Sequence, residues 1–335
     1  MKIIVDAFGG DNAPLAVIQG ARMAIDEYKT EIILSGDEKA IRDCANKNNI
    51  SLSGMKILQA DDVISMHDDP TSIIKSKKNS SMAVGLNALK NGMGDAFVSA
   101  GSTGALVVGG SLIVKRLKGI KRVALASVIP GKNNRYLMLD IGANADCRPE
   151  MLQQFGIMGS VYMSGVEHIK NPTVGLLNIG AEETKGAELQ KQSYLLLKNS
   201  PLNFVGNVES RDLPLGDVDV VVSDGFTGNI ALKLIEGVSY TMFSMIKSVL
   251  KKSIFTQFAA LILKKGLYEI KAKADYTEVG GAPLLGTSLP VFKAHGSSNA
   301  YAFKNAIGKA SDFAQAEVIQ KISDSLAAVT EIPQK

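Results

Sequence analysis

The chain has 335 residues, of which 46% are hydrophobic and 21% charged, and its 37 basic and 33 acidic residues leave a net charge of +4. This mild basic excess favours acidic partners, but without a basic block or an aromatic ladder it does not indicate a nucleic-acid-binding protein. Cys44 and Cys147 lack the CxxC spacing of a metal or redox site and are too few for a disulfide framework, so we expect a reducing cytoplasm.

The first apolar run of the chain, MKIIV, predicts a strand and not a signal peptide, because Asp6 interrupts it early. No window of about 18 or more uninterrupted apolar residues follows, so we expect no segment that spans a bilayer.

Further short apolar runs suit strands that are buried on both faces, and helical patterns separate them. In chain order, we expect strands at 2–5, 32–34, 96–99, 125–129, 137–141, 174–177 and 218–222. We expect helices at 13–28, 82–91, 104–116, 150–169, 188–198, 229–250 and 298 to about 329. The alternation predicts an α/β fold with a mostly parallel sheet. Because no low-complexity linker or internal repeat divides the chain, we expect a single domain over 1–335.

Four of the expected strands lead into loops rich in glycine and small polar residues, around Asp6, Ser99, Asp140 and Ser223. In open α/β sheets, ligands bind beyond the carboxyl ends of strands, often at helix N-termini whose free N–H groups attract anions. Glycine lets the backbone approach a phosphate closely, while hydroxyl and amide groups add donors. The candidate phosphate-binding and substrate-binding residues are Asp6, Gly9, Gly10, Asp11, Asn12, Ser99, Gly101, Ser102, Thr103, Asp140, Asn144, Asn178, Gly225, Thr227 and Gly228.

Any single loop of this kind can equally be only a helix cap, because Ser, Asp and Asn are favoured at that position. Four such loops in one sheet favour a site for an anion or a thioester. The turns contain neither GxxxxGK(S/T) nor GxGxxG, so the sequence does not indicate binding of a nucleoside triphosphate or a dinucleotide.

Longer motifs stand at fixed places along the chain. The sequence carries VDAFGGDNAP at 5–14, KSKKNSS at 75–81 after Pro70, and SAGSTGA at 99–105. The motifs LDIGANADCRPE, NIGAEETKG, VSDGFTGNIALK, GGAPLLG and HGSS follow in that order. With this set the chain resembles, over nearly its whole length, the bacterial phosphate acyltransferase family, which converts acyl-ACP to acyl phosphate in phospholipid synthesis. The resemblance implies a three-layer α/β/α fold like that of phosphotransacetylases and the isopropylmalate dehydrogenase group, a homodimer, and no metal or other cofactor.

The sequence departs from the family pattern at three places. Phe8 stands where a methionine is expected, Glu278-Val279 where bulkier apolar residues are expected, and TSLP at 287–290 replaces a glycine-containing stretch. These departures concern loop shape and the fit of a lipid chain, and they leave the polar motifs intact.

The resemblance implies that the chain transfers a long-chain acyl group from an acyl-ACP thioester to inorganic phosphate. Two alternatives stay open. A phosphotransacetylase acting on short-chain acyl-CoA would use the same phosphate loops, although the amphipathic stretch described below argues against it. A non-catalytic lipid-binding scaffold protein is the other alternative, and it would have no need of the polar loops.

Acyl transfer to phosphate requires a held phosphate, a polarised carbonyl and a departing thiolate, but no covalent nucleophile, so we expect direct displacement. Lys185, in the NIGAEETKG motif, is the first candidate to bind phosphate or stabilise the oxyanion. Its alternative is a solvated lysine at a helix start. Asn229 could donate to the oxyanion or the phosphate, or be a plain N-cap.

Two further polar side chains are candidate catalytic residues. Asp224 could orient Lys185 or accept a proton, although a carboxylate beside phosphate would repel it. His295 lies in a loop of small polar residues and could protonate the leaving thiolate, or be merely a hydrogen-bonding residue.

Cys147 has no adjacent histidine, so a packed structural role is favoured over acyl carriage. No His, Cys and Asp spacing predicts a metal site.

Residues 237–268 include no acidic residue but contain five lysines. At 100° per residue, six apolar side chains of this stretch fall on one helical stripe: Phe243, Ile246, Leu250, Ile254, Phe258 and Leu261. We expect an amphipathic helix or a broken helical hairpin at about 240–272 that rests on an anionic membrane. The lysines flank the stripe and would have to snorkel.

A dimer helix or a core helix is the alternative for this stretch, and its basic face could also meet the acidic acyl carrier protein. We therefore expect a cytoplasmic protein that associates peripherally with the membrane. The expected partners are acyl carrier protein, inorganic phosphate and a second copy of the chain, and no nucleic acid.

Overall fold

The computed structural model of the chain describes residues 1–274 and 280–330. Its strands are β1 (Lys2–Asp6), β2 (Glu31–Gly36), β3 (Met55–Gln59), β4 (Ala96–Ser99), β5 (Ala124–Pro130), β6 (Arg135–Leu139), β7 (Thr173–Asn178), β8 (Asn203–Glu209), β9 (Val220–Val222), β10 (Ala282–Leu285) and β11 (Val291–Lys293). Within the described residues they form an 11-stranded sheet in the order β3-β2-β1-β4-β11-β10-β5-β6-β9-β7-β8.

Most of the helices cover the two faces of this sheet, and two of them form a projecting hairpin. The helices are α1 (Leu15–Tyr28), α2 (Glu38–Lys47), η1 (Pro70–Ile74), α3 (Ser81–Lys90), α4 (Thr103–Gly109), η2 (Gly110–Lys115), α5 (Pro149–Gly165), α6 (Glu188–Lys198), η3 (Leu213–Leu215), α7 (Gly225–Leu250), α8 (Ile254–Ala274), α9 (Ala300–Gln315) and α10 (Val318–Thr330). Alternate residues of β1 belong to different core clusters, with Ile3 and Val5 in one and Ile4 in the other. Because successive side chains of a strand point to opposite faces, the two clusters lie on the two sides of the sheet. The fold is the expected three-layer α/β/α arrangement with a mostly parallel sheet.

The direction of the strands divides the sheet into two parallel groups. Strands β1 to β4 and β11 run parallel to one another, as do β6 to β9. The pairs β11-β10, β10-β5 and β5-β6 between them are antiparallel. Three reversals of direction leave the two groups pointing in opposite directions, so their carboxyl ends lie at opposite edges of the sheet.

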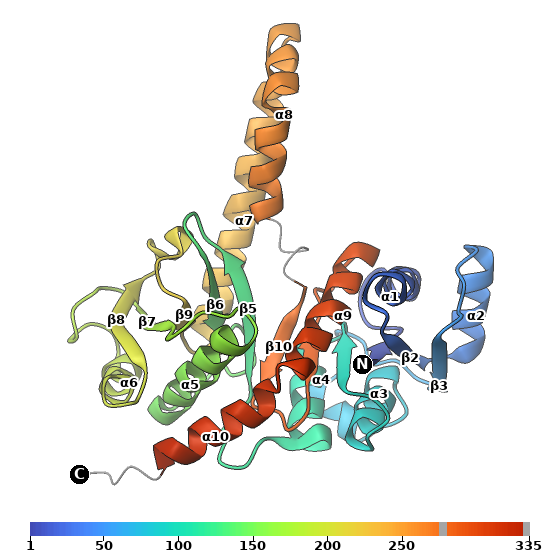
Figure 1. Cartoon of the computed structure of the whole chain (residues 1–335), viewed down its shortest axis with the longest axis horizontal. Helices are drawn as coiled ribbons and strands as arrows, with labels where there is room; N and C mark the ends of the chain where they lie inside the picture. Colours follow the sequence, from blue (N-terminus) through green and yellow to red (C-terminus); the bar gives the residue numbers. More distant parts are fainter. Residues whose placement is uncertain (275–279, 331–335) are drawn as a thin grey trace.

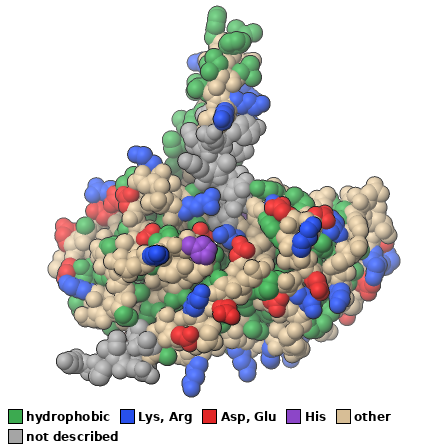
Figure 2. All heavy atoms as spheres, viewed as in Figure 1, with side chains coloured by type: hydrophobic (Ala, Val, Ile, Leu, Met, Phe, Trp, Pro, Cys, Tyr) green, Lys and Arg blue, Asp and Glu red, His purple; other side chains and the backbone are tan. Residues whose placement is uncertain are grey.

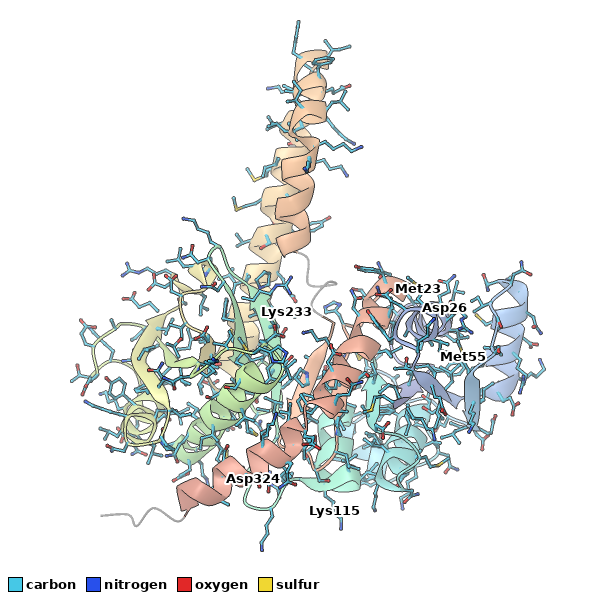
Figure 3. All side chains as sticks on the ribbon, viewed as in Figure 1. Met23, Asp26, Met55, Lys115, Lys233 and Asp324 are labelled. Carbon is cyan, nitrogen blue, oxygen red and sulfur yellow. The ribbon has the colours of Figure 1, made fainter. Side chains whose placement is uncertain are left out.

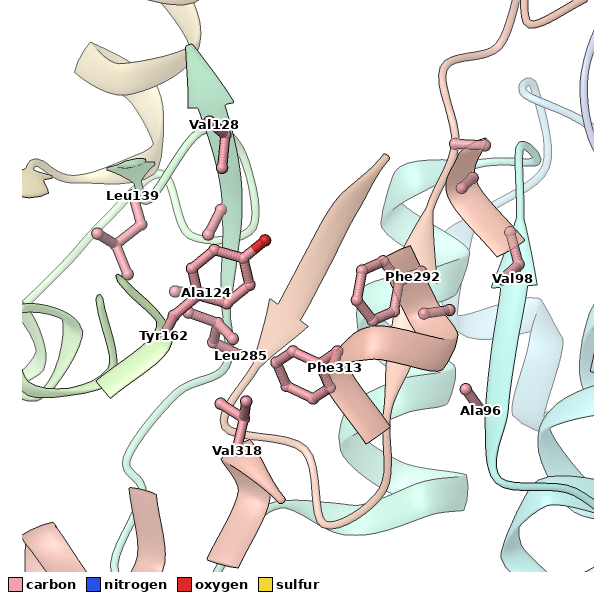
Figure 4. Close-up of a cluster of buried hydrophobic side chains, with 14 of the residues drawn as sticks. Ala96, Val98, Ala124, Val128, Leu139, Tyr162, Leu285, Phe292, Phe313 and Val318 are labelled. Atoms are coloured by element: carbon pink, nitrogen blue, oxygen red, sulfur yellow. The ribbon is translucent and has the colours of Figure 1, made fainter. Parts of the chain in front are cut away.

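A continuous hydrophobic core joins the two groups. Phe313 of α9 contacts Tyr162 of α5 and Phe292 of β11, with ring centroids 6.1 Å and 5.3 Å apart. All three rings are at most 2% exposed. Figure 4 shows these rings, with Leu285 and Val318 beside them, at the seam between the groups. Buried aromatic rings of this size contribute strongly to packing, so this seam fixes one half of the sheet against the other.

A helical hairpin extends from the compact body of the protein, and only its first turns pack against the core. Helices α7 and α8 lie side by side and project from the junction of the two strand groups (Figure 1). A short turn at 251–253 separates them, so the broken hairpin expected from the sequence is present and the single continuous helix is not. The six residues of the expected stripe are therefore divided between two helices.

Each expected strand and helix overlaps an observed one, but other elements were not anticipated. The strands β3, β8, β10 and β11 and the helix α2 fall outside the expected ranges. β10 and β11 are only 4 and 3 residues long, which is too short for a recognisable hydrophobic pattern. They form strands because neighbouring strands pair with them. The expected last helix is interrupted at Glu317, whose φ of 53° is left-handed and ends the helical hydrogen bonding.

Candidate functional site

The loops that follow β1, β4 and β11 form the first cluster of candidate residues. Ser99 Oγ donates a hydrogen bond of 2.7 Å to Asp6 Oδ2 and accepts one of 3.0 Å from the backbone N–H of Gly101. Burial raises the pKa of Asp6, and hydrogen bonds from hydroxyl groups, including that of Ser99, oppose the shift. The Asp6 carboxylate therefore fixes the Ser99 side chain, which in turn fixes the backbone of the loop at Gly101.

Residues from the N-terminal and C-terminal regions meet at the rim of this cluster. The backbone N–H of Asp11 donates to the carbonyl oxygen of Gly296 at 2.8 Å, and Asn12 Nδ2 lies 3.2 Å from the carbonyl oxygens of Ser297 and Ser298. The predicted residues Asp11 and Asn12 thus lie against the loop that carries His295, which the sequence alone did not place beside them.

Glycine is required where these loops touch. A Cβ atom added at Gly9 would stand 2.7 Å from the backbone nitrogen of Gly101 and 2.8 Å from Asp6 Oδ2. Gly10, at φ +98°, has a backbone conformation that side chains rarely adopt. Loop-to-loop packing therefore explains these two glycines, whether or not a phosphate approaches them.

Lys293, at the end of β11, is a candidate that the sequence analysis missed. Its side chain is buried, and its Nζ donates to the carbonyl oxygens of Ala100 at 3.0 Å and Ala294 at 2.5 Å. Burial lowers the pKa of Lys293 to about 8, against the opposing effects of Asp6 and Asp11. The only hint in the sequence is its place just before the HGSS motif.

His295 follows on the exposed side of the same loop. Its Nδ1 lies 2.8 Å from Ser297 Oγ. Partial burial lowers the pKa of His295, Lys233 and Lys293 lower it further, and Glu236 and Asp11 act in the opposite direction. The imidazole therefore favours its neutral form near neutral pH.

The second cluster follows β6 and β9 and is organised by Asp140. This buried carboxylate accepts hydrogen bonds of 2.8–3.1 Å from the backbone N–H groups of Leu125, Gly142, Ala143 and Asn144, and another from the Asn144 side chain. Burial raises the pKa of Asp140, while these hydrogen bonds oppose the rise. Because both carboxylate oxygens accept these hydrogen bonds, Asp140 fixes the backbone conformation of the loop at 142–144.

Helix α7 begins in contact with this loop. The backbone N–H of Gly225 donates to the carbonyl oxygen of Asn144 at 2.7 Å. Asp224 is the N-cap and accepts two hydrogen bonds of 2.8 Å from Thr227, one from its backbone and one from its hydroxyl. Asn229 lies inside the helix and donates through Nδ2 to the carbonyl oxygen of Ile141 at 2.8 Å, so the interpretation of Asn229 as an N-cap is wrong.

Lys185 lies in the loop between β7 and α6. Asn178 closes this loop, because its Nδ2 donates to the carbonyl oxygen of Lys185 at 3.1 Å while its Oδ1 accepts from the N–H of Ile179 at 2.8 Å. The Lys185 side chain is exposed, and no hydrogen bond or ion pair joins its ammonium to another of the described residues. The ammonium is therefore available to an anionic ligand.

Most of the predicted residues thus form two clusters, Lys185 and Asn178 lie in a third loop, and α7 extends from the second cluster toward the first. About 12 Å of helix separates Gly225 from Lys233. The Nζ of Lys233 lies 2.9 Å from Glu236 Oε2, and both side chains act on the pKa of His295. Figure 3 shows Lys233 at the base of the projecting hairpin, between the two halves of the sheet. Lys233 is a second candidate cation that the sequence analysis did not select.

Cys147 is a partly buried thiol beside the second cluster. The Sγ of Cys147 lies 3.7 Å from the carbonyl oxygen of Asn144, and burial raises the pKa of this thiol to about 12. A thiol that stays protonated is a weak nucleophile, in agreement with a structural role. Within 1–274 and 280–330, no group of three or more His, Cys, Asp or Glu side chains is placed to hold a metal ion.

The hairpin exposes many apolar side chains. Only Gly225 and Gly228 are buried among the 26 residues of α7. Near the turn, Ile254 is 77% exposed, and Phe258 and Leu261 are each 68% exposed. Figure 2 shows hydrophobic and basic side chains together at the far end of the hairpin. Among the described residues, no helix combines the length and the apolar character needed to cross a bilayer.

Comparisons with known proteins cover nearly the whole chain. The family described as fatty acid synthesis protein matches residues 1–321. A phosphate acyltransferase from Acetivibrio thermocellus is 50% identical over 323 residues, which are 96% of this chain and 95% of that protein. A phosphate acyltransferase from Clostridium acetobutylicum is 48% identical over 327 residues, which are 97% of this chain and 99% of that protein.

Solved structures of other enzymes share the fold. A phosphotransacetylase from Streptococcus pyogenes superposes with a TM-score of 0.62 at 19% identity, and EutD phosphotransacetylase from Staphylococcus aureus with a TM-score of 0.60 at 16% identity. Each comparison covers 94% of both chains. At these identities the likeness concerns the architecture and not the substrate.

Proposed function

Because the chain belongs to the fatty acid synthesis protein family, whose curated relatives are phosphate acyltransferases, we propose that it transfers a long-chain acyl group from acyl-ACP to inorganic phosphate. The products are acyl phosphate and carrier protein with a free thiol. The near-complete match to these relatives supports acyl transfer to phosphate, and the exposed apolar hairpin supports a lipid substrate.

The reaction proceeds by direct displacement. A phosphate oxygen attacks the thioester carbonyl, the carbon–sulfur bond breaks, and the electron pair leaves with the sulfur. Because a thiol has a pKa near 8.5, the thiolate can leave and then take up a proton, which the attacking hydrogen phosphate releases as it becomes acyl phosphate. Most of the rate enhancement then comes from positioning the phosphate and stabilising the oxyanion.

Lys185 supplies positive charge in this reaction. Its ammonium projects from a loop closed by Asn178 and has no partner among the described side chains, so it can neutralise the phosphate or the oxyanion. Asn229 is held by Ile141 at the second cluster and can orient a ligand there. Asp224 serves as the N-cap through Thr227, which keeps the first turn of α7 in place.

The hairpin contacts the membrane through its exposed end. Ile254, Phe258 and Leu261 offer apolar surface, and Lys251 and Lys252 lie in the turn beside them. Basic residues near an anionic bilayer contribute about 1 kcal/mol each, and apolar burial adds to this. The protein is then a cytoplasmic enzyme that binds the membrane peripherally and releases its lipid product there. The same basic surface can attract the acidic carrier protein.

The base of the hairpin meets a second copy of the chain. Leu234, Val238 and Met242 are 64%, 49% and 57% exposed and recur every four residues along α7. If two copies of the hairpin pack together as in a helical bundle, the apolar residues of one copy bury those of the other. This proposal accounts for the homodimer that the family resemblance implies.

The test is to incubate the purified protein with palmitoyl-ACP and phosphate and to measure acyl phosphate together with free carrier thiol. We expect phosphate-dependent release of thiol that survives chelation of divalent ions. Turnover of acetyl-CoA without turnover of palmitoyl-ACP would instead support a short-chain phosphotransacetylase. Absence of both reactions, with vesicle binding retained, would support a scaffold protein.

A further inference from the structure

A pocket of about 500 Å³ lies beside the second loop cluster, and none of the residues assigned to the reaction so far lines it. Its lining residues are Lys121, Arg122, Asp146, Cys147, Arg148 and Met151. This volume falls in the range typical of sites for small organic ligands, well above the roughly 30 Å³ that a water molecule occupies.

The charge of the lining favours an anion. Three of the six lining side chains are cations and one is a carboxylate. Lys121 Nζ lies 3.6 Å from Glu150 Oε2, but the guanidinium groups of Arg122 and Arg148 form no ion pair with another described residue. Arg148 is the N-cap of α5, a helix of 17 residues whose N-terminal end adds positive potential. Two unpaired guanidinium groups suit the forked geometry of a phosphate.

The pocket shares a wall with the candidate site. Cys147 lines the pocket, and its Sγ lies 3.7 Å from the carbonyl oxygen of Asn144. That same oxygen accepts the N–H of Gly225 at the start of α7. A ligand anchored in the pocket can therefore extend past this loop toward the second cluster.

We propose that this pocket binds the phosphate of the phosphopantetheine arm on which the carrier presents the acyl thioester, an inference that rests on the proposed function. Inorganic phosphate offers the same chemistry, but a pocket of this volume, with Met151 as an apolar wall, suits an organic phosphate better. Arg122 and Arg148 are exposed, which also suits this ligand, because the phosphate of the arm is attached to the carrier protein and must stay near the surface.

The test compares acyl-4′-phosphopantetheine with acyl-pantetheine, which lacks only the phosphate. For the wild-type protein we expect kcat/KM to be at least about tenfold higher with the phosphorylated thioester. In Arg122→Ala/Arg148→Ala this preference should fall to near unity, while kcat/KM for acyl-pantetheine and the KM for inorganic phosphate stay unchanged. The matched control Arg135→Ala/Arg211→Ala removes two exposed arginines elsewhere and should keep the preference.

Several outcomes would overturn the proposal. A wild-type protein without preference for the phosphorylated thioester would do so, as would a double variant that keeps the preference. A raised KM for inorganic phosphate in the double variant would show that the pocket holds the co-substrate. If the wild type turns over neither thioester, the proposed function fails, and calorimetry with free 4′-phosphopantetheine still decides whether the pocket binds it through Arg122 and Arg148.

Discussion

Gly228, in the first turn of α7, lies directly against the carbonyl oxygen of Asp140 at the end of β6. A Cβ atom added at Gly228 would overlap that oxygen, and it would also stand 2.6 Å from Ser223 Oγ. The start of the long helix is therefore locked to the loop that Asp140 organises. A single methyl group at this position would force the two elements apart.

Replacing Gly228 by alanine should destabilise the protein severely, by about 4 kcal/mol or more, because buried backbone cannot yield to the new methyl group. Urea unfolding followed by circular dichroism measures the loss. The matched control is Gly237→Ala in the same helix, where no atom lies within 4 Å of the added Cβ. That change should be neutral or stabilise α7 by about 0.5–1 kcal/mol. Equal stabilities of the two variants would contradict the packing described here.

Lys185→Ala should lower kcat/KM by at least about tenfold, which corresponds to ~1.4 kcal/mol of transition-state stabilisation. The fold should be unaffected, because the Lys185 side chain is exposed. Steady-state kinetics with palmitoyl-ACP and phosphate provide the measurement. Lys191→Ala removes another exposed lysine, six positions further along, and should retain wild-type rates. Wild-type kinetics in a well-folded Lys185→Ala protein would rule out the assigned role.

The stability of the protein should depend on pH through Lys293. Burial lowers the pKa of Lys293 in the folded state to about 8, from 10.5 for an ordinary lysine. Between these two values the unfolded chain binds more protons than the folded chain, so the free energy of unfolding should rise with pH across this window. Below about pH 8 the lysine is protonated in both states, and its contribution no longer changes with pH.

Denaturant titrations of the wild type and of Lys293→Met between pH 8 and pH 10 test this expectation. As the pH rises, the free energy of unfolding of the wild type should increase by about 1–2 kcal/mol relative to that of Lys293→Met. The exposed Lys191→Met serves as the control and should follow the wild-type profile. A difference that stays constant with pH would show that Lys293 keeps an ordinary pKa.

Replacing Leu250, Ile254 and Phe258 together by glutamate should release the protein from anionic vesicles while sparing activity on soluble acyl-ACP. The substitutions remove apolar contact and add charges that the surface repels, so both contributions to binding fall. Vesicle sedimentation is the measurement, and wild-type binding should weaken with added salt.

The control for this triple variant places the same three charges elsewhere, at Met66, Leu195 and Val205, which are exposed and outside the hairpin. That protein should stay on the vesicles. Size-exclusion chromatography and circular dichroism distinguish loss of lipid contact from loss of a dimer interface. A hairpin variant that remains folded, dimeric and fully bound to vesicles would refute the membrane proposal.

The sequence by itself determined the fold class and the principal strands and helices, because buried parallel strands produce continuous apolar runs that stand out between helical patterns. The motifs of the glycine-rich loops also identified the family, since they are carried in a fixed order along the chain. Short elements escaped prediction. Strands β10 and β11 have too few residues for a pattern of their own, and they exist because β4 and β5 offer edges to pair with.

Only the tertiary structure decided how the candidate residues are grouped. The reversals of strand direction at β10 and β5 place the loop of Asp6 and Ser99 at one edge of the sheet and that of Asp140 at the other, so residues expected in one site form two clusters. Lys293 became a candidate through its burial, which is a property of its surroundings and not of its neighbours in the sequence. Strand direction and burial arise from contacts between distant segments, so no local pattern of residues can encode them.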